Sequence, residues 1–199
     1  MTDLLILRHG PTAWNTDGLI QGRTDVPLSP EGEAVVRGWR IPDDLRARAW
    51  IASPLARCLA TARLLGLEPV IDPRLVETDW GVWEGRTLVD LRAELGNLMA
   101  AWEARGLDFR APGGESPREV QDRLRPWLVE VAAVGHPTGV VAHKGVIRAL
   151  YALATGWDMT DKARHKLQDG CAHRFTLGGD GMPEIAELNI ALDQNRMQP

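Results

Sequence analysis

The chain has few of the features that mark secreted or membrane-embedded proteins. It contains two cysteines, Cys58 and Cys171, and neither lies in a paired-cysteine motif. Their scarcity excludes a disulfide-rich scaffold and favours reduced thiols in a reducing compartment. No apolar run approaches the length needed to span a bilayer, and the N-terminus lacks the basic and apolar regions of a signal peptide. We therefore expect a cytoplasmic protein without membrane contact.

Positive charge is not in excess either. The chain carries 23 Lys and Arg against 27 Asp and Glu, a net charge of -4. A nucleic-acid partner usually requires a basic surface, so we expect none. A pocket can still be locally positive inside an acidic protein, so an anionic small molecule remains possible as a ligand. Compact His, Asp and Glu spacings typical of metal sites are also missing, so we expect no metal and no cofactor.

What the chain does have is an ordinary globular composition. Hydrophobic residues make up 44% and charged residues 25%, close to the average of soluble domains. There is no internal repeat, low-complexity tract or long linker. We therefore expect one domain over residues 1–199.

Short apolar runs alternate with stretches of helical spacing, which predicts an α/β fold. Serines followed by prolines, Ser29-Pro30 and Ser53-Pro54, are typical of helix starts. The expected strands cover residues 4–7, 49–52, 70–71, 139–142, 174–177 and 184–188, the last two as a hairpin across 178–181. The expected helices begin at Ser29 and cover 55–65, 88–104, 116–133 and 145–154, with residues 11–30 as a loop.

Polar residues follow the ends of three expected strands. Arg8 and His9 come directly after the first strand, Arg57 lies shortly after the second, and His143 follows the strand at 139–142. In open α/β sheets, ligands bind at the carboxyl ends of the strands. We therefore expect these four side chains to lie along one edge of one sheet.

These residue types suit the transfer of a phosphoryl group. The transferred group carries negative charge on three oxygens, and the planar forks of Arg8 and Arg57 can each engage two of them. Thr12 and Asn15 could add neutral donors from the following loop. A neutral imidazole is a nucleophile at physiological pH, and two nearby arginines should keep His9 uncharged.

Two further residues complete the predicted reaction. A protonated His143 could bind the charge that develops on the phosphoryl oxygens. The leaving alkoxide needs a proton, which a carboxyl group of raised pKa could supply before acting as base for water. Glu77 is our candidate, with Asp79 and Glu84 as nearby alternatives.

Five segments, taken together, resemble the histidine phosphatase superfamily, the phosphoglycerate-mutase-like proteins. The resemblance begins with Leu7-Arg8-His9-Gly10 and continues in family order to residue 150. It implies a three-layer α/β sandwich whose mostly parallel mixed sheet has helices on both faces. It also implies a phosphate pocket of Arg8, His9, Arg57 and His143, with His9 phosphorylated and Glu77 as the acid. The matching segments are residues 7–15, 21–28, 53–62, 75–85 and 140–150.

Substrate contacts are expected from residues inside these segments, namely Thr12, Asn15, Gln21, Gly22 and Lys144. Two positions depart from the family pattern. Lys144 stands where a small residue is usual, and its charge could reach the substrate or point to solvent. Cys58 replaces a common alanine and is interpreted as a small core residue.

The pattern favours a phosphatase over a mutase, because the interval between Glu77 and His143 is short and an open site admits water. A phosphoglycerate mutase-type phosphotransferase is the alternative, and a non-catalytic module that binds phosphorylated ligands is a third hypothesis. The expected partner is a small phosphorylated substrate, and a homodimer is possible. Sugar phosphates, phosphoglycerates, ribazole phosphate and phosphoproteins all remain candidates as substrates.

Overall fold

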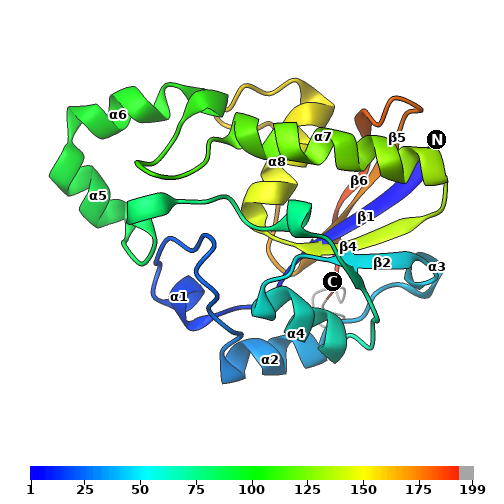
Figure 1. Cartoon of the computed structure of the whole chain (residues 1–199). Helices are drawn as coiled ribbons and strands as arrows, with labels where there is room; N and C mark the ends of the chain where they lie inside the picture. The colour runs from blue at the N-terminus through cyan, green and yellow to red at the C-terminus, as the bar shows by residue number, and fades with distance from the viewer. Residues whose placement is uncertain (193–199) are drawn as a thin grey trace.

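A six-stranded mixed sheet forms the centre of the computed structural model, which describes residues 1–192 (Figure 1). The strand order is β3-β2-β4-β1-β5-β6. Strands β3, β2, β4 and β1 run parallel, and β5 is antiparallel to both of its neighbours, so five of the six strands share one direction. The strands are β1 (Thr2–Arg8), β2 (Ala49–Ala52), β3 (Val70–Ile71), β4 (Thr138–Ala142), β5 (Cys171–Leu177) and β6 (Pro183–Ala191).

The central strand β1 explains why helices cover both faces. Successive side chains of a strand point to opposite faces, and all four residues from Leu4 to Leu7 are buried. Leu4 and Ile6 pack in one hydrophobic cluster, whereas Leu5 and Leu7 pack in another. A continuous apolar run is typical of a strand that is buried on both sides.

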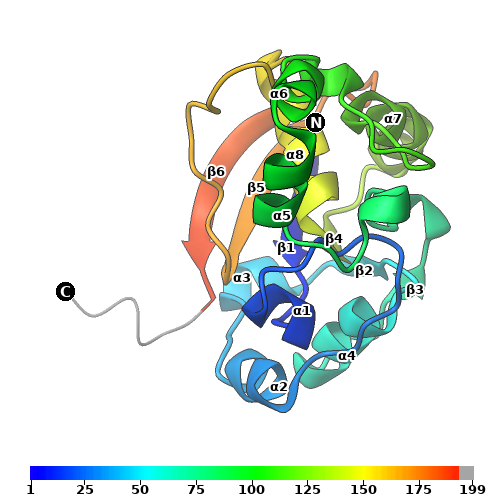
Figure 2. The same ribbon diagram turned by 90° about the vertical axis from the view of Figure 1, so that its left-hand side faces the viewer.

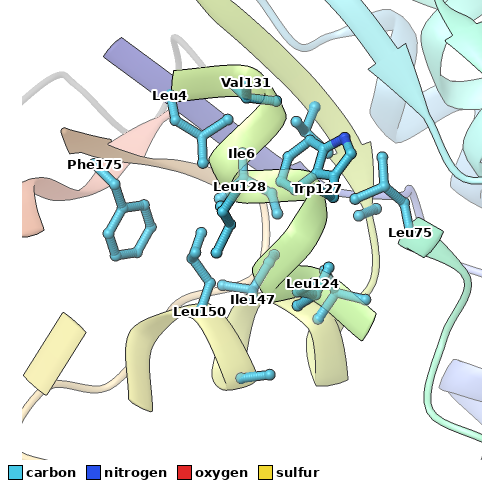
Figure 3. Packing of buried hydrophobic residues seen from close by; sticks show 14 of the residues in the cluster. Leu4, Ile6, Leu75, Leu124, Trp127, Leu128, Val131, Ile147, Leu150 and Phe175 are labelled. Atoms are coloured by element: carbon cyan, nitrogen blue, oxygen red, sulfur yellow. The ribbon is translucent and has the colours of Figure 1, made fainter. Parts of the chain in front are cut away.

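Helices α7 (Pro117–Val134) and α8 (Lys144–Thr155) cover the face that carries Leu4 and Ile6. Figure 3 shows Leu124, Trp127 and Leu128 of α7 packed over this face together with Ile147 of α8. The opposite face is covered by α2 (Pro30–Arg37), α3 (Asp43–Arg46) and α4 (Ala56–Leu64) (Figure 2). The expected three-layer sandwich with a mostly parallel mixed sheet is thus confirmed.

Helix starts agree with the sequence at two of the expected positions and differ at a third. The Ser29 side chain accepts a hydrogen bond from Gly32 N, and Ser116 forms a capping box with Glu119. The prediction that Ser53 caps the next helix is wrong. The N-cap of α4 is Leu55, which makes no side-chain cap, because the hydroxyl of Ser53 is hydrogen-bonded to His143.

The predicted helix over 88–104 is wrong as a single element. It is divided into α5 (Leu88–Leu95) and α6 (Asn97–Glu103). Gly96 separates them with a φ of 50°, which is outside the right-handed helical region and is readily adopted only by glycine. The predicted loop at 11–30 also contains a short helix, α1 (Ala13–Thr16).

Helices α5 and α6 project beside the main body (Figure 1). Where the chain enters and leaves this segment, Val82 N donates to Pro112 O at 3.2 Å. Gly81, in the short 3₁₀ turn Gly81–Trp83, has a φ of 51°. A Cβ atom there would lie 2.2 Å from Pro112 O, so the close approach of the two chain segments requires glycine. Two other 3₁₀ turns are Pro73–Leu75 and Gly106–Asp108.

The expected late hairpin is present and is longer than predicted. Strands β5 and β6 pair in an antiparallel ladder, and Gly178 N donates to Met182 O in the turn that joins them. Within residues 1–192, none of the helices is both long and apolar enough to cross a lipid bilayer.

Candidate active site

The carboxyl ends of β1, β4 and β2 bring together residues that are distant in the sequence. His9 N donates to Ala142 O at 3.0 Å, and Ser53 N donates to Val141 O at 3.1 Å. These two backbone bonds continue the pairing with β4 by one residue past the ends of β1 and β2. As a result the rings of His9 and His143 have their centroids 5.2 Å apart, with an angle of 60° between their planes.

The backbone carbonyl of Gly10 holds the His9 ring in one tautomer. The side chain is buried, and Nδ1 lies 2.7 Å from Gly10 O. Because a carbonyl oxygen only accepts, Nδ1 carries the proton and the neutral ring keeps its lone pair on Nε2. Burial lowers the pKa of His9 well below 6.5, and the charges of Arg8 and Arg57 lower it further. The ring is therefore neutral at physiological pH.

The loop that carries His9 is fixed to α4 by Thr61. Gly10 N donates to the hydroxyl of Thr61 at 2.9 Å, and that hydroxyl donates to Arg57 O at 2.7 Å. Thr61 is fully buried. A single threonine thus connects the backbone beside His9 to the backbone of Arg57.

Arg57 is fully buried, and within residues 1–192 it is the largest of the side chains that have almost no exposed surface. Its Nε donates to His143 Nδ1 at 3.3 Å, and its two terminal nitrogens donate to Thr24 O at 3.0 Å and Gly22 O at 2.7 Å. Burial lowers the pKa of Arg57, although an arginine stays charged at neutral pH. The loop at 22–24 therefore holds this guanidinium group against the second histidine.

His143 differs from its predicted charge state. Nδ1 accepts from Arg57, so Nε2 carries the proton and donates to the hydroxyl of Ser53 at 2.7 Å. Burial lowers the pKa of His143 well below 6.5, and the charges of His9 and Arg57 lower it further. The expectation of a protonated His143 overlooked burial, which disfavours the charged imidazole.

Cys58 also touches His143, with Sγ 3.4 Å from Nε2. Its thiol donates to Ala142 O, and burial raises its pKa. The interpretation of Cys58 as a small core residue holds for its burial but omits this contact. No disulfide joins Cys58 to Cys171.

Glu77 is buried at the N-terminus of α8. Gly145 N donates to both carboxylate oxygens at 3.1 and 3.2 Å, and Thr78 N donates to Oε1 at 2.8 Å. Burial raises the pKa of Glu77, while those two N–H groups and the charges of Arg8 and Arg57 partly oppose the rise. The carboxyl group thus has the raised pKa that a general acid needs.

The two alternative acids have different environments. Glu84 accepts hydrogen bonds from Arg23 N, Thr24 N, the hydroxyl of Thr24 and Trp80 N. Burial tends to raise the pKa of Glu84, but these bonds outweigh it and the pKa is lowered. Asp79 accepts from Gly81 N at 2.8 Å and pairs with Arg23. Glu84 therefore supports the loop that holds Arg57, and its pKa is lowered whereas that of Glu77 is raised.

The predicted neutral donors Thr12 and Asn15 are both turned toward Gln21. Thr12 Oγ1 and Asn15 Nδ2 donate to Gln21 Oε1 at 3.3 and 3.4 Å. Thr12 and Asn15 also form the capping box of α1. Their donors are thus used within the loop, whereas Gln21 Nε2 is buried without a hydrogen-bond partner among residues 1–192. Gln21 is the better candidate for a neutral donor to a substrate.

Arg8 and Lys144 lie on the more open side of the site. Arg8 Nη1 donates to Asp169 Oδ1 at 2.6 Å. Lys144 is exposed at the start of α8. Partial loss of solvent around Asp169 tends to raise its pKa, but the charge and hydrogen bond of Arg8 and the charge of Lys144 outweigh this effect and lower it. Both cations therefore lie near one carboxylate, and Lys144 faces solvent.

Sequence reasoning missed three residues that support the site, Ser53, Thr61 and Asp169. Ser53 and Thr61 lie within a segment recognised by its pattern, but their hydroxyls were assigned no contact with the site. Asp169 lies outside every recognised segment, and no sequence signal points to it. Within residues 1–192, no group of three or more His, Cys, Asp and Glu side chains could hold a metal ion.

Comparisons with known proteins find relatives that match most of this chain. A glucosyl-3-phosphoglycerate phosphatase of Mycolicibacterium vanbaalenii is 37% identical over 169 residues, which cover 77% of this chain and 74% of that protein. A 2,3-bisphosphoglycerate-dependent phosphoglycerate mutase of Azorhizobium caulinodans is 29% identical over 191 residues, or 89% and 93% of the two chains.

A solved structure of the mycobacterial glucosyl-3-phosphoglycerate phosphatase in complex with VO3 superposes with a TM-score of 0.81 at 27% identity. The match covers 96% of this chain and 100% of that one. The sequence profile of the histidine phosphatase superfamily (branch 1) matches residues 4–191. The chain therefore belongs to the histidine phosphatase superfamily, branch 1.

Proposed function

We propose that the chain hydrolyses phosphomonoesters through a phosphohistidine intermediate on His9. The observation that carries the proposal is the hydrogen bond between His9 Nδ1 and Gly10 O. This bond leaves the lone pair on Nε2, in a neutral ring between two guanidinium groups. A neutral nucleophile beside concentrated positive charge is what attack on a phosphoryl dianion requires.

Arg8 and Arg57 bind the phosphoryl oxygens in this proposal, with Gln21 as a neutral donor. Arg8 Nε and Gln21 Nε2 are both buried without a hydrogen-bond partner within residues 1–192. A buried donor that makes no bond costs free energy, and a phosphoryl oxygen is a suitable acceptor. His143 supports this arrangement, because its Nδ1 accepts from Arg57 Nε and so helps to hold the guanidinium group.

The first step forms the phosphohistidine. Nε2 of His9 attacks phosphorus in line with the ester bond, and the P–O bond to the alcohol breaks. Glu77 transfers its proton to the departing alkoxide and becomes a carboxylate. Gly145 N and Thr78 N already donate to this group, so they stabilise the negative charge that it acquires.

The second step regenerates the enzyme. The Glu77 carboxylate accepts a proton from water while the water oxygen attacks phosphorus. The P–N bond to His9 breaks, its electron pair returns to Nε2, and orthophosphate leaves. The proton that Glu77 gave to the alcohol is thus replaced by one from water, and no step requires a metal ion.

Similarity to relatives supports a small phosphorylated metabolite as the substrate. One relative is named a glucosyl-3-phosphoglycerate phosphatase, and another a phosphoglycerate mutase. A shared phosphoryl pocket fits both reactions, since they differ in the acceptor, which is water or a second hydroxyl. We propose water as the acceptor here and a small phosphate ester as the substrate.

The test is hydrolysis of p-nitrophenyl phosphate in the presence of EDTA, with quenching in an alkaline denaturant to trap a labelled protein. We expect phosphate release, and an acid-labile phosphate that is absent from H9A. Transfer from 2,3-bisphosphoglycerate to phosphoglycerate, without net phosphate release, would replace hydrolysis by the mutase reaction. Binding of orthophosphate by calorimetry without any turnover would instead show a binding module.

A further inference from the structure

A segment without helix or strand connects α8 to β5 and ends beside the candidate active site. Residues 156–170 leave α8 and run alongside β6 before they enter β5 (Figure 2). Because β5 is antiparallel to β1, with Leu7 opposite Ala172, the start of β5 lies at the carboxyl end of β1. The topology therefore places Asp169, two residues before β5, next to Arg8.

The contact between Arg8 and Asp169 uses one particular edge of the guanidinium group. Asp169 Oδ1 accepts from Nη1 at 2.6 Å. Nε of Arg8 is buried and makes no hydrogen bond within residues 1–192. The N–H of Nε points to the same side as Nη2, and these two nitrogens form a fork that can engage two oxygens of an anion. Asp169 therefore holds the guanidinium by Nη1 and leaves the Nε and Nη2 fork open.

Asp169 is itself held in place by a residue of β6. Asn189 Nδ2 donates to Lys166 O at 3.0 Å, and Asn189 Oδ1 accepts from Gln168 N at 2.8 Å. Just beyond Asp169, Gly170 O accepts from Leu192 N at 3.1 Å. The backbone is thus fixed on both sides of an aspartate whose side chain is 63% exposed.

The local geometry of Asn189 is unusual for a strand. Its φ is 61°, in the left-handed region, and the pairing of β5 with β6 is irregular between Ala172 and Arg174. Asn189 N is directed to His173 Nδ1 at 3.2 Å. A left-handed residue in a strand costs free energy and persists only where its surroundings fix it. Here the conformation lets one asparagine side chain bind two backbone groups of the neighbouring segment.

We propose that Asp169 is a positioning residue of the active site, which orients Arg8 so that its Nε and Nη2 fork faces the phosphoryl group. The inference rests on the proposed function. Asn189 has an indirect role, since it fixes the segment that carries Asp169. An ion pair at the surface contributes little to stability. The role of the pair between Arg8 and Asp169 is therefore to orient the guanidinium group of Arg8.

Two variants test the charge and the reach of Asp169. D169N keeps the shape but loses the charge, and we expect kcat on p-nitrophenyl phosphate to fall on the order of tenfold, since small misplacements of a binding group are costly. KM should change less, because the bidentate contact matters most in the transition state. D169E should restore kcat to within about threefold of the parent, since an exposed site has room for one more methylene. D161N is the matched control, because Asp161 lies in the same segment and accepts a hydrogen bond from Trp157, away from Arg8.

A third variant tests the support from Asn189. In N189G, the glycine can adopt the same left-handed backbone conformation. The change removes both side-chain hydrogen bonds, to Lys166 O and from Gln168 N. We expect it to lower kcat in the same direction as D169N and to leave the melting temperature within a few degrees of the parent. Combined with D169N, it should add little further loss, because both changes act through the same contact.

The outcomes separate this inference from the proposed function. If the parent protein hydrolyses no ester, the proposed function fails. If the parent is active and D169N has unchanged kcat, Asp169 has no positioning role. If D169N binds orthophosphate more tightly and turns over faster, Asp169 competes with the substrate for Arg8, and the inference is overturned.

Discussion

The candidate site has two ends that are built in different ways. The phosphate end consists of His9, Arg57, His143 and Glu77, all buried and all hydrogen-bonded to backbone or to one another. His9 and His143 directly follow β1 and β4, Arg57 lies in α4, and Glu77 follows the 3₁₀ turn Pro73–Leu75. These elements contribute residues to the two large hydrophobic clusters. The end that would meet the rest of the substrate is formed by residues 14–24 and 79–116, most of them in loops and short helices.

The second end has a much smaller core. Its cluster contains four buried residues, Trp83, Leu91, Met99 and Ala111. The ion pairs on α5 and α6, such as Arg92 with Glu103, are exposed, and such pairs contribute at most about 1 kcal/mol each. In the proposed function, the reaction is therefore carried by residues beside the two large clusters, whereas the rest of the substrate meets a segment whose own core is small. We expect the second segment to open locally at a lower free-energy cost than the first.

Removing the nucleophile tests the first end most directly. H9A should reduce hydrolysis of p-nitrophenyl phosphate by more than about 10⁴-fold, because nucleophile loss leaves only binding contributions. Initial rates measured by p-nitrophenolate release check the value. H136A is the control, since His136 is exposed and lies before β4 at the opposite edge of the sheet. Residual activity within a factor of ten would contradict a phosphohistidine on His9.

The acid role of Glu77 distinguishes between classes of ester. E77Q should slow alkyl phosphates by about 10²–10⁴-fold and p-nitrophenyl phosphate far less, since a good leaving group needs no proton. Paired kcat/KM values on the two substrates measure the difference. Equal slowing of both esters would remove Glu77 from the role of acid.

The pH profile gives a second view of Glu77. Burial raises its pKa above 4.5, so the proton required by alkyl phosphates is lost as the pH rises through that pKa. His9 must be neutral, and its pKa lies well below 6.5, so activity is also lost as the pH falls through the pKa of His9. We expect the alkaline limb to disappear in E77Q, whose side chain holds no titrating proton.

A change at the boundary between the two ends should have an intermediate effect. E84Q weakens the bonds from Arg23 N and Thr24 N, which fix the loop whose carbonyl oxygens hold Arg57. We expect kcat/KM on p-nitrophenyl phosphate to fall on the order of tenfold. E94Q is the control, because Glu94 lies on α5 and pairs only with Arg86 at the surface. Equal activity of both variants would show that the loop stays in place without Glu84.

The smallest effect on kcat is expected from a substitution in the cluster of Trp83, Leu91, Met99 and Ala111. M99A removes a buried side chain of α6 and should cost about 2–4 kcal/mol locally. Hydrogen exchange should then be faster in residues 88–103, while kcat on p-nitrophenyl phosphate stays within about twofold. L124A in the large cluster is the comparison and should destabilise the whole fold. A large loss of kcat in M99A would mean that the two ends are not separable.

Sequence reasoning predicted the phosphate end better than the other end for a physical reason. Strands are continuous apolar runs, and the rule that ligands bind at strand ends placed Arg8, His9, Arg57 and His143 together without any distance information. The side chains that orient them were harder to predict. A serine before a proline predicts a helix cap at Ser53, but in the folded chain its hydroxyl is hydrogen-bonded to His143 instead.

The remaining errors come from effects that are not local in the sequence. The division of the helix at 88–104 depends on the positive φ of Gly96, which a pattern with helical spacing on both sides conceals. The charge of His143 depends on how deeply the folded chain buries it. Asp169 meets Arg8 only because β5 runs against β1, and its surrounding sequence carries no motif.

The close approach of Gly81 to Pro112 has a consequence for substitution at position 81. A side chain there would meet the backbone of residues 112–114 and would push apart the two chain segments that flank α5 and α6. Glu84 follows three residues later and accepts from Arg23 N and Thr24 N, so the displacement would pass to the loop whose carbonyl oxygens hold Arg57. A glycine far from the histidines in the sequence thus helps to keep a guanidinium group in place.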